Sequence, residues 1–211
     1  MKVYKFGGAS VKSADGVRNL RRIVDGEENL FIIVSAMGKT TNALESVFTH
    51  MQNRRKREAA DEIKRIKEYH ASIVDDLWGG HVEIEAVNRL FGELHDIAVD
   101  TVYRAADAEL WYDTIVAYGE LISTTIISEY LKFTGIRNRW FDMRAAFVTN
   151  QRHKDAYVNI KVSEPRLKAA TENTGVGVFV GQGFIGAAPD GTTTTLGREG
   201  SDYSAAVAAY I

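Results

Sequence analysis

The sequence predicts an α/β protein with three layers, in which helices cover both faces of a mainly parallel sheet that carries a long helical hairpin insertion. Three observations support this prediction. Strand-like and helical segments alternate along much of the 211-residue chain, as in parallel sheets. The run Leu30–Val34 is apolar at every position, the pattern of a strand buried on both faces. The middle of the chain instead shows long helical periodicity in a charged background.

The first elements are expected to be a strand, a helix and a second strand. Val3–Phe6 is short and β-prone, and two glycines follow it, which predicts a strand that enters a glycine loop. Ser13 is a suitable N-cap for the helix that follows. The apolar stripe of this helix consists of Val17, Leu20, Ile23 and Val24. The second strand, Leu30–Val34, ends in a loop of small and hydroxyl residues, 35–42.

The middle of the chain predicts two long antiparallel helices over residues 43–78 and 82–110. Apolar residues recur there at steps of three and four, and Gly79 and Gly80 interrupt the pattern. The basic quartet at residues 54–57 lies beside acidic residues, which indicates a solvated helix face rather than a nucleic-acid site. The pair of helices is therefore expected to be an all-helical excursion from the sheet.

The remaining third returns to alternating strands and helices. A helix over 113–133 is expected to end at Gly135, and another to begin at Ser163 with Pro165 in its first turn. The expected strands are 139–142, 156–160, 177–180 and 183–186. An alanine-rich helix follows the turn around residues 192–202. Ligands of such sheets collect at the carboxyl ends of the strands, where these loops lie.

Composition excludes several classes of protein. The formal charge is −2, which gives no basic field for nucleic acid or an anionic membrane surface. Without cysteine there are no disulfides, catalytic thiols or thiolate metal sites. We see no signal peptide and no apolar run of about 20 residues, so a cytoplasmic enzyme or binding domain is expected. No two of the five histidines have metal-ligand spacing, which argues against a zinc site but leaves nucleotide-borne Mg²⁺ open.

Two loops near the amino terminus have the chemistry of anion sites. In Lys5–Gly8 a lysine precedes two glycines, whose backbone N–H groups can approach a phosphate closely. The alternative is a plain glycine turn with a surface lysine. In Ser35–Asn42 hydroxyls precede a helix, where they can hold a carboxylate or phosphate or merely cap the helix through Thr41 or Asn42. It is no P-loop, because no glycine stands five positions before Gly38.

Two later segments carry charges suited to an amino acid. Glu120 follows Gly119 in an apolar, hydroxyl-bearing helix, where its carboxylate can bind an ammonium group or pair on the surface. In the closing turn, Arg198 offers a two-pronged grip on a carboxylate and Asp202 an acceptor for an amine. The alternative for Ser201 and Asp202 is simple N-capping of the last helix.

Together the segments resemble aspartate kinase, of the amino acid kinase family. The resemblance rests on Lys5–Val11, Val34–Asn42, Tyr118–Glu120, Gly183–Gly186 and Thr194–Ala205, and the last is the most specific. The helical excursion also resembles the helical hairpin that aspartate kinases insert after the second loop. The resemblance implies transfer of the ATP γ-phosphoryl group to the side-chain carboxylate of L-aspartate, the entry step to lysine, threonine and methionine synthesis. ATP would bring Mg²⁺ with it.

The resemblance also implies the role of each site residue. Lys5 and Asp202 would be catalytic, with Lys5 stabilising the transferred phosphoryl group. Gly7, Gly8 and Ser10 would join Lys5 in binding phosphate. The remaining substrate contacts would be Ser35 and Thr41 to aspartate or phosphate, Glu120 and Asp202 to the ammonium, Arg198 to the α-carboxylate, and Ser201 in the same pocket. The full-length protein is expected to be a homo-oligomer, with no nucleic-acid or membrane partner.

The sequence departs from the family pattern at three points. Ala9 stands where threonine is usual, and Glu199 where glycine is frequent; we expect Glu199 to point away from the site. The chain also lacks the nucleotide-binding C-terminal part and the regulatory ACT domains, so we expect a truncated form covering the amino-terminal portion of the kinase domain. Two alternatives stay open: a related kinase acting on another acid such as acetylglutamate, glutamate or a nucleoside monophosphate, and a non-catalytic amino-acid-binding module.

Overall fold

A four-stranded parallel sheet forms the centre of the protein, with strand order β1-β2-β4-β3. The computed structural model describes residues 1–172 and 174–211. The sheet strands are β1 (Lys2–Phe6), β2 (Leu30–Val34), β3 (Arg139–Phe141) and β4 (Val178–Gln182). A small antiparallel hairpin, β5 (Ile185–Ala187) and β6 (Thr193–Thr195), follows β4. The predicted parallel sheet is confirmed, whereas β6 was not anticipated.

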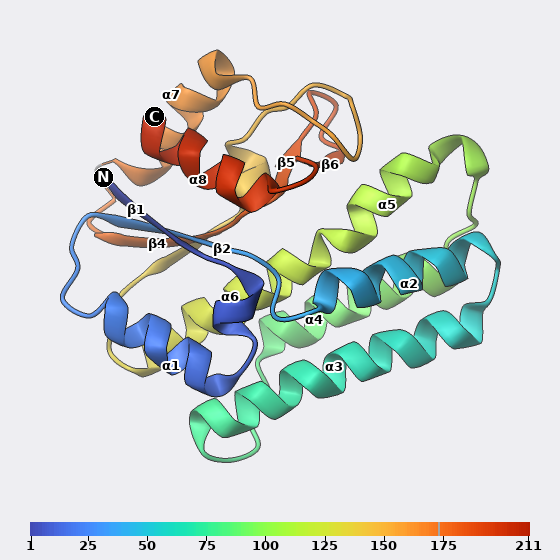
Figure 1. Ribbon diagram of the computed structural model, residues 1–211, viewed down its shortest axis with the longest axis horizontal. Coiled ribbons are helices and arrows are strands. Elements are labelled where there is room, and N and C mark those ends of the chain that lie inside the picture. Colours follow the sequence, from blue (N-terminus) through green and yellow to red (C-terminus); the bar gives the residue numbers. More distant parts are fainter. Residues whose placement is uncertain (173) are drawn as a thin grey trace.

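Helices cover both faces of the sheet, which confirms the three-layer prediction. On one face lie α1 (Ala14–Ile23) and α6 (Tyr118–Phe133), and on the other α7 (Ile160–Thr171) and α8 (Gly200–Tyr210) (Figure 1). Alternate residues of β2 supply both cores, because successive side chains of a strand point to opposite faces. Leu30 and Ile32 pack with the first pair of helices, and Phe31 packs with the second. All five residues of β2 are buried.

The helical excursion has more pieces than the sequence predicted. In place of two long helices it contains α2 (Thr40–Gln52), α3 (Lys56–Trp78) and α4 (Glu85–His95), followed by a π-helical turn at Asp96–Asp100 and a 3₁₀ turn at Ala105–Asp107. The first expected helix is broken at Arg54, whose φ of 55° is left-handed. Gly79 ends α3 in a left-handed cap, as its position after the apolar pattern indicated. The basic quartet is exposed, but half of it lies in the turn before α3.

Several expected boundaries are corrected by the structure. The predicted helix 113–133 is two helices, α5 (Ala108–Val116) and α6, joined at Ala117. No strand covers 156–160, where only an isolated bridge joins Val158 to Thr149. Helix α7 begins three residues before Ser163, which places Pro165 inside the helix rather than in its first turn. Ser13 caps α1 as predicted by accepting from the Gly16 N–H, whereas Ile23 is 48% exposed and lies outside the buried stripe.

Candidate active site

A cavity of about 310 Å³ opens where the carboxyl ends of β1, β2 and β4 meet the start of α8. Seven of the ten predicted site residues line it: Lys5, Gly8, Ser35, Thr41, Glu120, Ser201 and Asp202. Gly7, Ser10 and Arg198 do not line it. A larger cavity of about 600 Å³ lies beside Met1, Asn29 and Ile211, at the amino ends of the strands. The smaller cavity is therefore the one in the usual ligand position of a parallel sheet.

Glu120 is the most unusual group in the cavity. It lies in the first turn of α6 with 3% of its surface exposed. Its Oε1 accepts the Ala36 N–H at 3.0 Å, whereas its Oε2 is buried and has no partner among the described residues. Burial raises the pKa of the Glu120 carboxyl to about 8, against the opposing effect of the Ala36 hydrogen bond. The alternative of a surface or ion-paired glutamate is thereby excluded.

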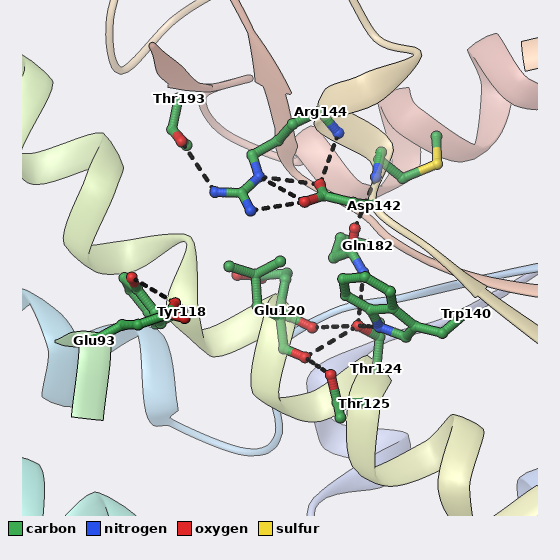
Figure 2. A network of polar contacts seen from close by, with 12 residues as sticks. Glu93, Tyr118, Glu120, Thr124, Thr125, Trp140, Asp142, Arg144, Gln182 and Thr193 are labelled. Carbon is green, nitrogen blue, oxygen red and sulfur yellow. Dashed lines mark hydrogen bonds and ion pairs between the residues drawn. The ribbon is translucent and has the colours of Figure 1, made fainter. Parts of the chain in front are cut away.

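Hydrogen bonds from two strands and one loop fix the turn of α6 that carries Glu120. The Thr124 hydroxyl donates to the Glu120 carbonyl at 2.7 Å and accepts from Gln182 Nε2 and Trp140 Nε1 (Figure 2). In the same turn as Thr124, the Ser123 hydroxyl donates to the Ser35 carbonyl at 2.8 Å. The helix is thus tied to β3, to β4 and to the loop after β2. The Glu120 carboxylate is accordingly held at a fixed place on the cavity wall.

An ion pair joins the two ends of the chain across the cavity. Lys5 Nζ lies 3.0 Å from Asp202 Oδ1, which connects β1 to the first turn of α8. The N-cap position of α8 is Glu199, and no side chain makes a capping hydrogen bond there. Asp202 lies inside the first turn instead. The alternative of simple capping by Ser201 or Asp202 is therefore wrong. The capping alternative for Thr41 and Asn42 is also wrong, since α2 begins at Thr40.

Close backbone approaches explain the glycines around the cavity. A Cβ on Gly8 would lie 2.4 Å from the Ala36 carbonyl oxygen, and one on Gly183 would lie 2.6 Å from Ser201. These contacts bring the Lys5 loop against the Ser35 loop and the start of α8 against the end of β4. A Cβ on Gly7 would lie 3.5 Å from Lys5 Nζ, so glycine leaves the space beside the ammonium open.

Sequence reasoning missed some residues of the cavity. Phe184, Gly197 and Gly200 also line it. Phe184 has a φ of 68°, a rare conformation for a bulky residue and one that marks functional sites. Its position in the glycine-flanked segment 183–186 was the available signal. Glu199, which we expected to point away from the site, is exposed and lies among the residues at the cavity.

Comparison with known proteins identifies the family. The sequence profile of the amino acid kinase family matches residues 1–211. The chain belongs to the amino acid kinase family. Among the curated relatives of this chain, lysine-sensitive aspartokinase 3 of Escherichia coli K12 is 32% identical over 209 residues, covering 98% of this chain and 45% of the relative. An aspartokinase of Chlamydia trachomatis is also 32% identical, over 97% of this chain and 44% of the relative.

Solved structures of similar proteins agree with the fold. Escherichia coli aspartokinase III in complex with lysine and aspartate has a TM-score of 0.84 and 30% identity, over 99% of this chain and 46% of that chain. The same enzyme with aspartate and ADP has a TM-score of 0.83. The chain thus spans about half the length of these relatives. No helix in the described part of the chain is long and apolar enough to cross a membrane.

Proposed function

We propose that the cavity binds L-aspartate and that the protein acts in the ATP-dependent phosphorylation of its side-chain carboxylate, which gives 4-phospho-L-aspartate. One observation carries this proposal: Glu120 Oε2 is buried at the cavity and lacks a partner among the described residues. A buried carboxylate without a partner is costly, and the ammonium group of an amino acid supplies the missing donor and charge. Escherichia coli aspartokinase III has been solved in complex with aspartate, which supports this choice of ligand.

The charges of the cavity fit an amino acid with a second carboxylate. In our proposal Glu120 and Asp202 receive the ammonium group, and Arg198 grips the α-carboxylate in a two-pronged contact. Ser35, Thr41 and Ser201 offer hydroxyls to the same molecule. An acetylated amine has no positive charge to pair with Glu120, which argues against acetylglutamate as the substrate.

Lys5 is the residue that we assign to the phosphoryl group. As the carboxylate oxygen bonds to the γ-phosphorus, the bond to the bridging oxygen of ATP breaks and ADP leaves. The ammonium of Lys5 stabilises the negative charge on the phosphoryl oxygens during this transfer, with Gly7, Gly8 and Ser10 as further contacts. The open space beside Lys5 Nζ at Gly7 is compatible with an anion there. Lys5 must then exchange its partner Asp202 for the phosphoryl group.

Mg²⁺ is proposed to arrive with the nucleotide, where it neutralises charge on the phosphates. The cavity offers Glu120, Glu199 and Asp202 as carboxylates, and we assign two of these to the amine. Among the described residues, the one group with metal-ligand spacing is His95, Asp96 and Asp100 at the end of α4, outside the cavity. We therefore assign no residue of this chain as a Mg²⁺ ligand.

We further propose that residues 1–211 supply the amino-acid-binding portion of an amino acid kinase domain, with residues 43–110 as its helical insertion. The pathway role proposed is the first step toward lysine, threonine and methionine. This proposal rests on the relatives, of which the chain covers about half.

Calorimetric titration with L-aspartate, with L-glutamate as the matched control, tests the substrate. We expect aspartate to bind and glutamate to bind at least about tenfold more weakly, because the cavity holds its charges at fixed spacing. The variant Glu120→Gln should lose most of this affinity while remaining folded. Equal affinity for both amino acids, or unchanged aspartate binding by Glu120→Gln, would contradict the proposal.

A further inference from the structure

A second buried carboxylate, Asp113 on α5, lies outside the cavity and has no role in the function proposed above. Its side chain is 0% exposed. The carboxylate accepts from three groups: the Thr195 hydroxyl at 2.5 Å, His153 Nδ1 at 2.8 Å, and the Lys154 N–H at 3.1 and 3.0 Å to its two oxygens. These donors come from two segments some forty residues apart in sequence, and both approach α5 at this one group.

In the first of these segments, residues 153–155, both the backbone N–H and the side-chain ammonium of Lys154 contact α5. Lys154 has a φ of 65°, a left-handed conformation that is disfavoured for a residue with a Cβ. Its N–H reaches both oxygens of Asp113 in this conformation. Its ammonium lies 4.6 Å from the centre of the Tyr112 ring, a cation–π distance. Neighbouring residues of α5 therefore hold the backbone and the side chain of the same lysine.

The second segment leads directly into the loop that carries Arg198. Thr195 is the last residue of β6, and its carbonyl accepts the Ala156 N–H at 2.9 Å. Two residues on, a Cβ at Gly197 would lie 2.9 Å from Asp155 Oδ1. The segment 153–155 therefore packs against the start of the loop, and Asp113 binds both the segment and the loop.

The tip of this loop contrasts with its base. Arg198 and Glu199 are exposed, and in the part of the chain that the structure describes neither side chain makes a hydrogen bond or ion pair. Three contacts hold the base: Thr195 binds the buried Asp113, the Leu196 N–H donates to the Phe184 carbonyl at 2.8 Å, and Gly197 packs tightly against Asp155. A loop with a fixed base and a free tip can place one long side chain on a ligand with little backbone rearrangement.

Burying the Asp113 carboxylate between α5 and β6 costs free energy, which indicates that its role is to position the segments that it binds. Burial raises the pKa of the Asp113 carboxyl, and the hydrogen bonds from Thr195, Lys154 and His153 act in the opposite direction. An apolar side chain would pack between α5 and β6 without this cost. The carboxylate of Asp113, however, binds donors from both segments at once: its Oδ1 accepts from Thr195 and Lys154, and its Oδ2 accepts from His153 and Lys154.

We propose that Asp113, supported by His153, is a positioning residue that sets the base of the loop 195–200 so that Arg198 reaches the α-carboxylate of the amino acid substrate. The inference rests on the proposed function for the identity of that ligand. It adds a residue that touches no substrate and acts through Arg198.

Three variants of the 211-residue chain separate positioning from mere stability. Asp113→Asn keeps the size of the side chain but replaces one acceptor by a donor, and Thr195→Val removes a single hydroxyl. Ser128→Ala is the matched control. Ser128 lies in the second half of α6, is equally buried, and donates its hydroxyl to Asn138 Oδ1 at 2.7 Å. We expect Asp113→Asn to weaken aspartate binding about tenfold and Thr195→Val about threefold, with no change for Ser128→Ala.

A double-mutant cycle tests whether Asp113 acts through Arg198. In an Arg198→Ala background the effect of Asp113→Asn on aspartate affinity should disappear, since the loop no longer carries the group that it positions. A tenfold effect that persists in that background would overturn the proposal. Unchanged affinity in folded Asp113→Asn would also overturn it.

A readout without substrate keeps the test independent of the proposed function. We expect amide hydrogen exchange at Leu196 and Gly200 to accelerate at least about tenfold in Asp113→Asn, with the amides of α6 unaffected. If the wild-type chain binds no aspartate, the proposed function fails, and exchange alone decides whether Asp113 anchors the loop. Equal acceleration throughout the protein would mean that Asp113 contributes only to global stability.

Discussion

The raised pKa of Glu120 predicts that aspartate binding strengthens with pH. The carboxyl of the ligand-free cavity has a pKa of about 8. An ammonium beside a carboxylate favours its ionised form, so binding must remove the proton that Glu120 holds at neutral pH. At pH 7 this deprotonation costs on the order of 1 kcal/mol. The ionised fraction rises from a few per cent at pH 6.5 to the majority at pH 8.5, so the association constant should rise by at least about tenfold.

Calorimetry in buffers of different ionisation enthalpy measures this coupling directly. At pH 7 we expect release of about 0.9 proton for each aspartate bound, and about 0.2 proton at pH 8.5. The control is Glu120→Gln, in which binding should be weak and independent of pH over the same range. An affinity that is flat from pH 6.5 to 8.5, or a pH dependence that survives in Glu120→Gln, would refute the reasoning.

The same carboxyl affects stability without any ligand. Its pKa is raised in the folded protein from a reference value of 4.5, so the folded state binds the proton more tightly than the unfolded state. The contribution to stability is present at low pH and is lost as the pH rises toward 8. Relative to Glu120→Gln, wild type should lose about 3 kcal/mol between pH 5 and pH 8 in urea unfolding. A constant difference between the two proteins would contradict the burial of an ionisable group.

Three further predictions concern the rest of the cavity. In the full-length protein, Lys5→Met should reduce phosphoryl transfer, measured as ADP release, at least about 100-fold while changing aspartate affinity less than about threefold; equal losses of both would remove the role assigned to Lys5. Arg198→Ala should weaken aspartate binding by about 2 kcal/mol with no change in melting temperature, since the side chain is exposed; intact affinity would exclude it as the carboxylate clamp. Gly183→Ala should destabilise by about 1–3 kcal/mol in thermal unfolding, because its Cβ meets Ser201 at 2.6 Å, whereas Gly92→Ala, with open space in α4, should stabilise slightly.

The parts of the fold that the sequence predicted are those that depend on local pattern. β2 was predicted because five apolar residues in a row need burial on both faces. Ser13 and Gly79 were predicted as helix ends from their own chemistry. The break between α2 and α3 was not predicted, because the polar run at residues 52–58 is also compatible with a solvated helix face, while the backbone turns at Arg54. β6 was missed since a short run of threonines has no distinctive pattern.

The site was predicted in its chemistry but not in its geometry. The sequence indicates that Lys5, Glu120 and Asp202 carry suitable charges, whereas their meeting in one cavity depends on the parallel order of β1, β2 and β4. The unpartnered oxygen of Glu120 is a property of the packed protein and has no sequence signal. Asp113 shows the same limit, because its donors lie about forty and eighty residues away along the chain.

The orientation of bound aspartate is the most direct test of the central claim. A crystal structure of the chain with L-aspartate should show the ammonium nitrogen within about 3 Å of Glu120 Oε2. The α-carboxylate should lie on Arg198, and the side-chain carboxylate should face Lys5. Aspartate bound in the reverse orientation, or outside this cavity, would contradict the account.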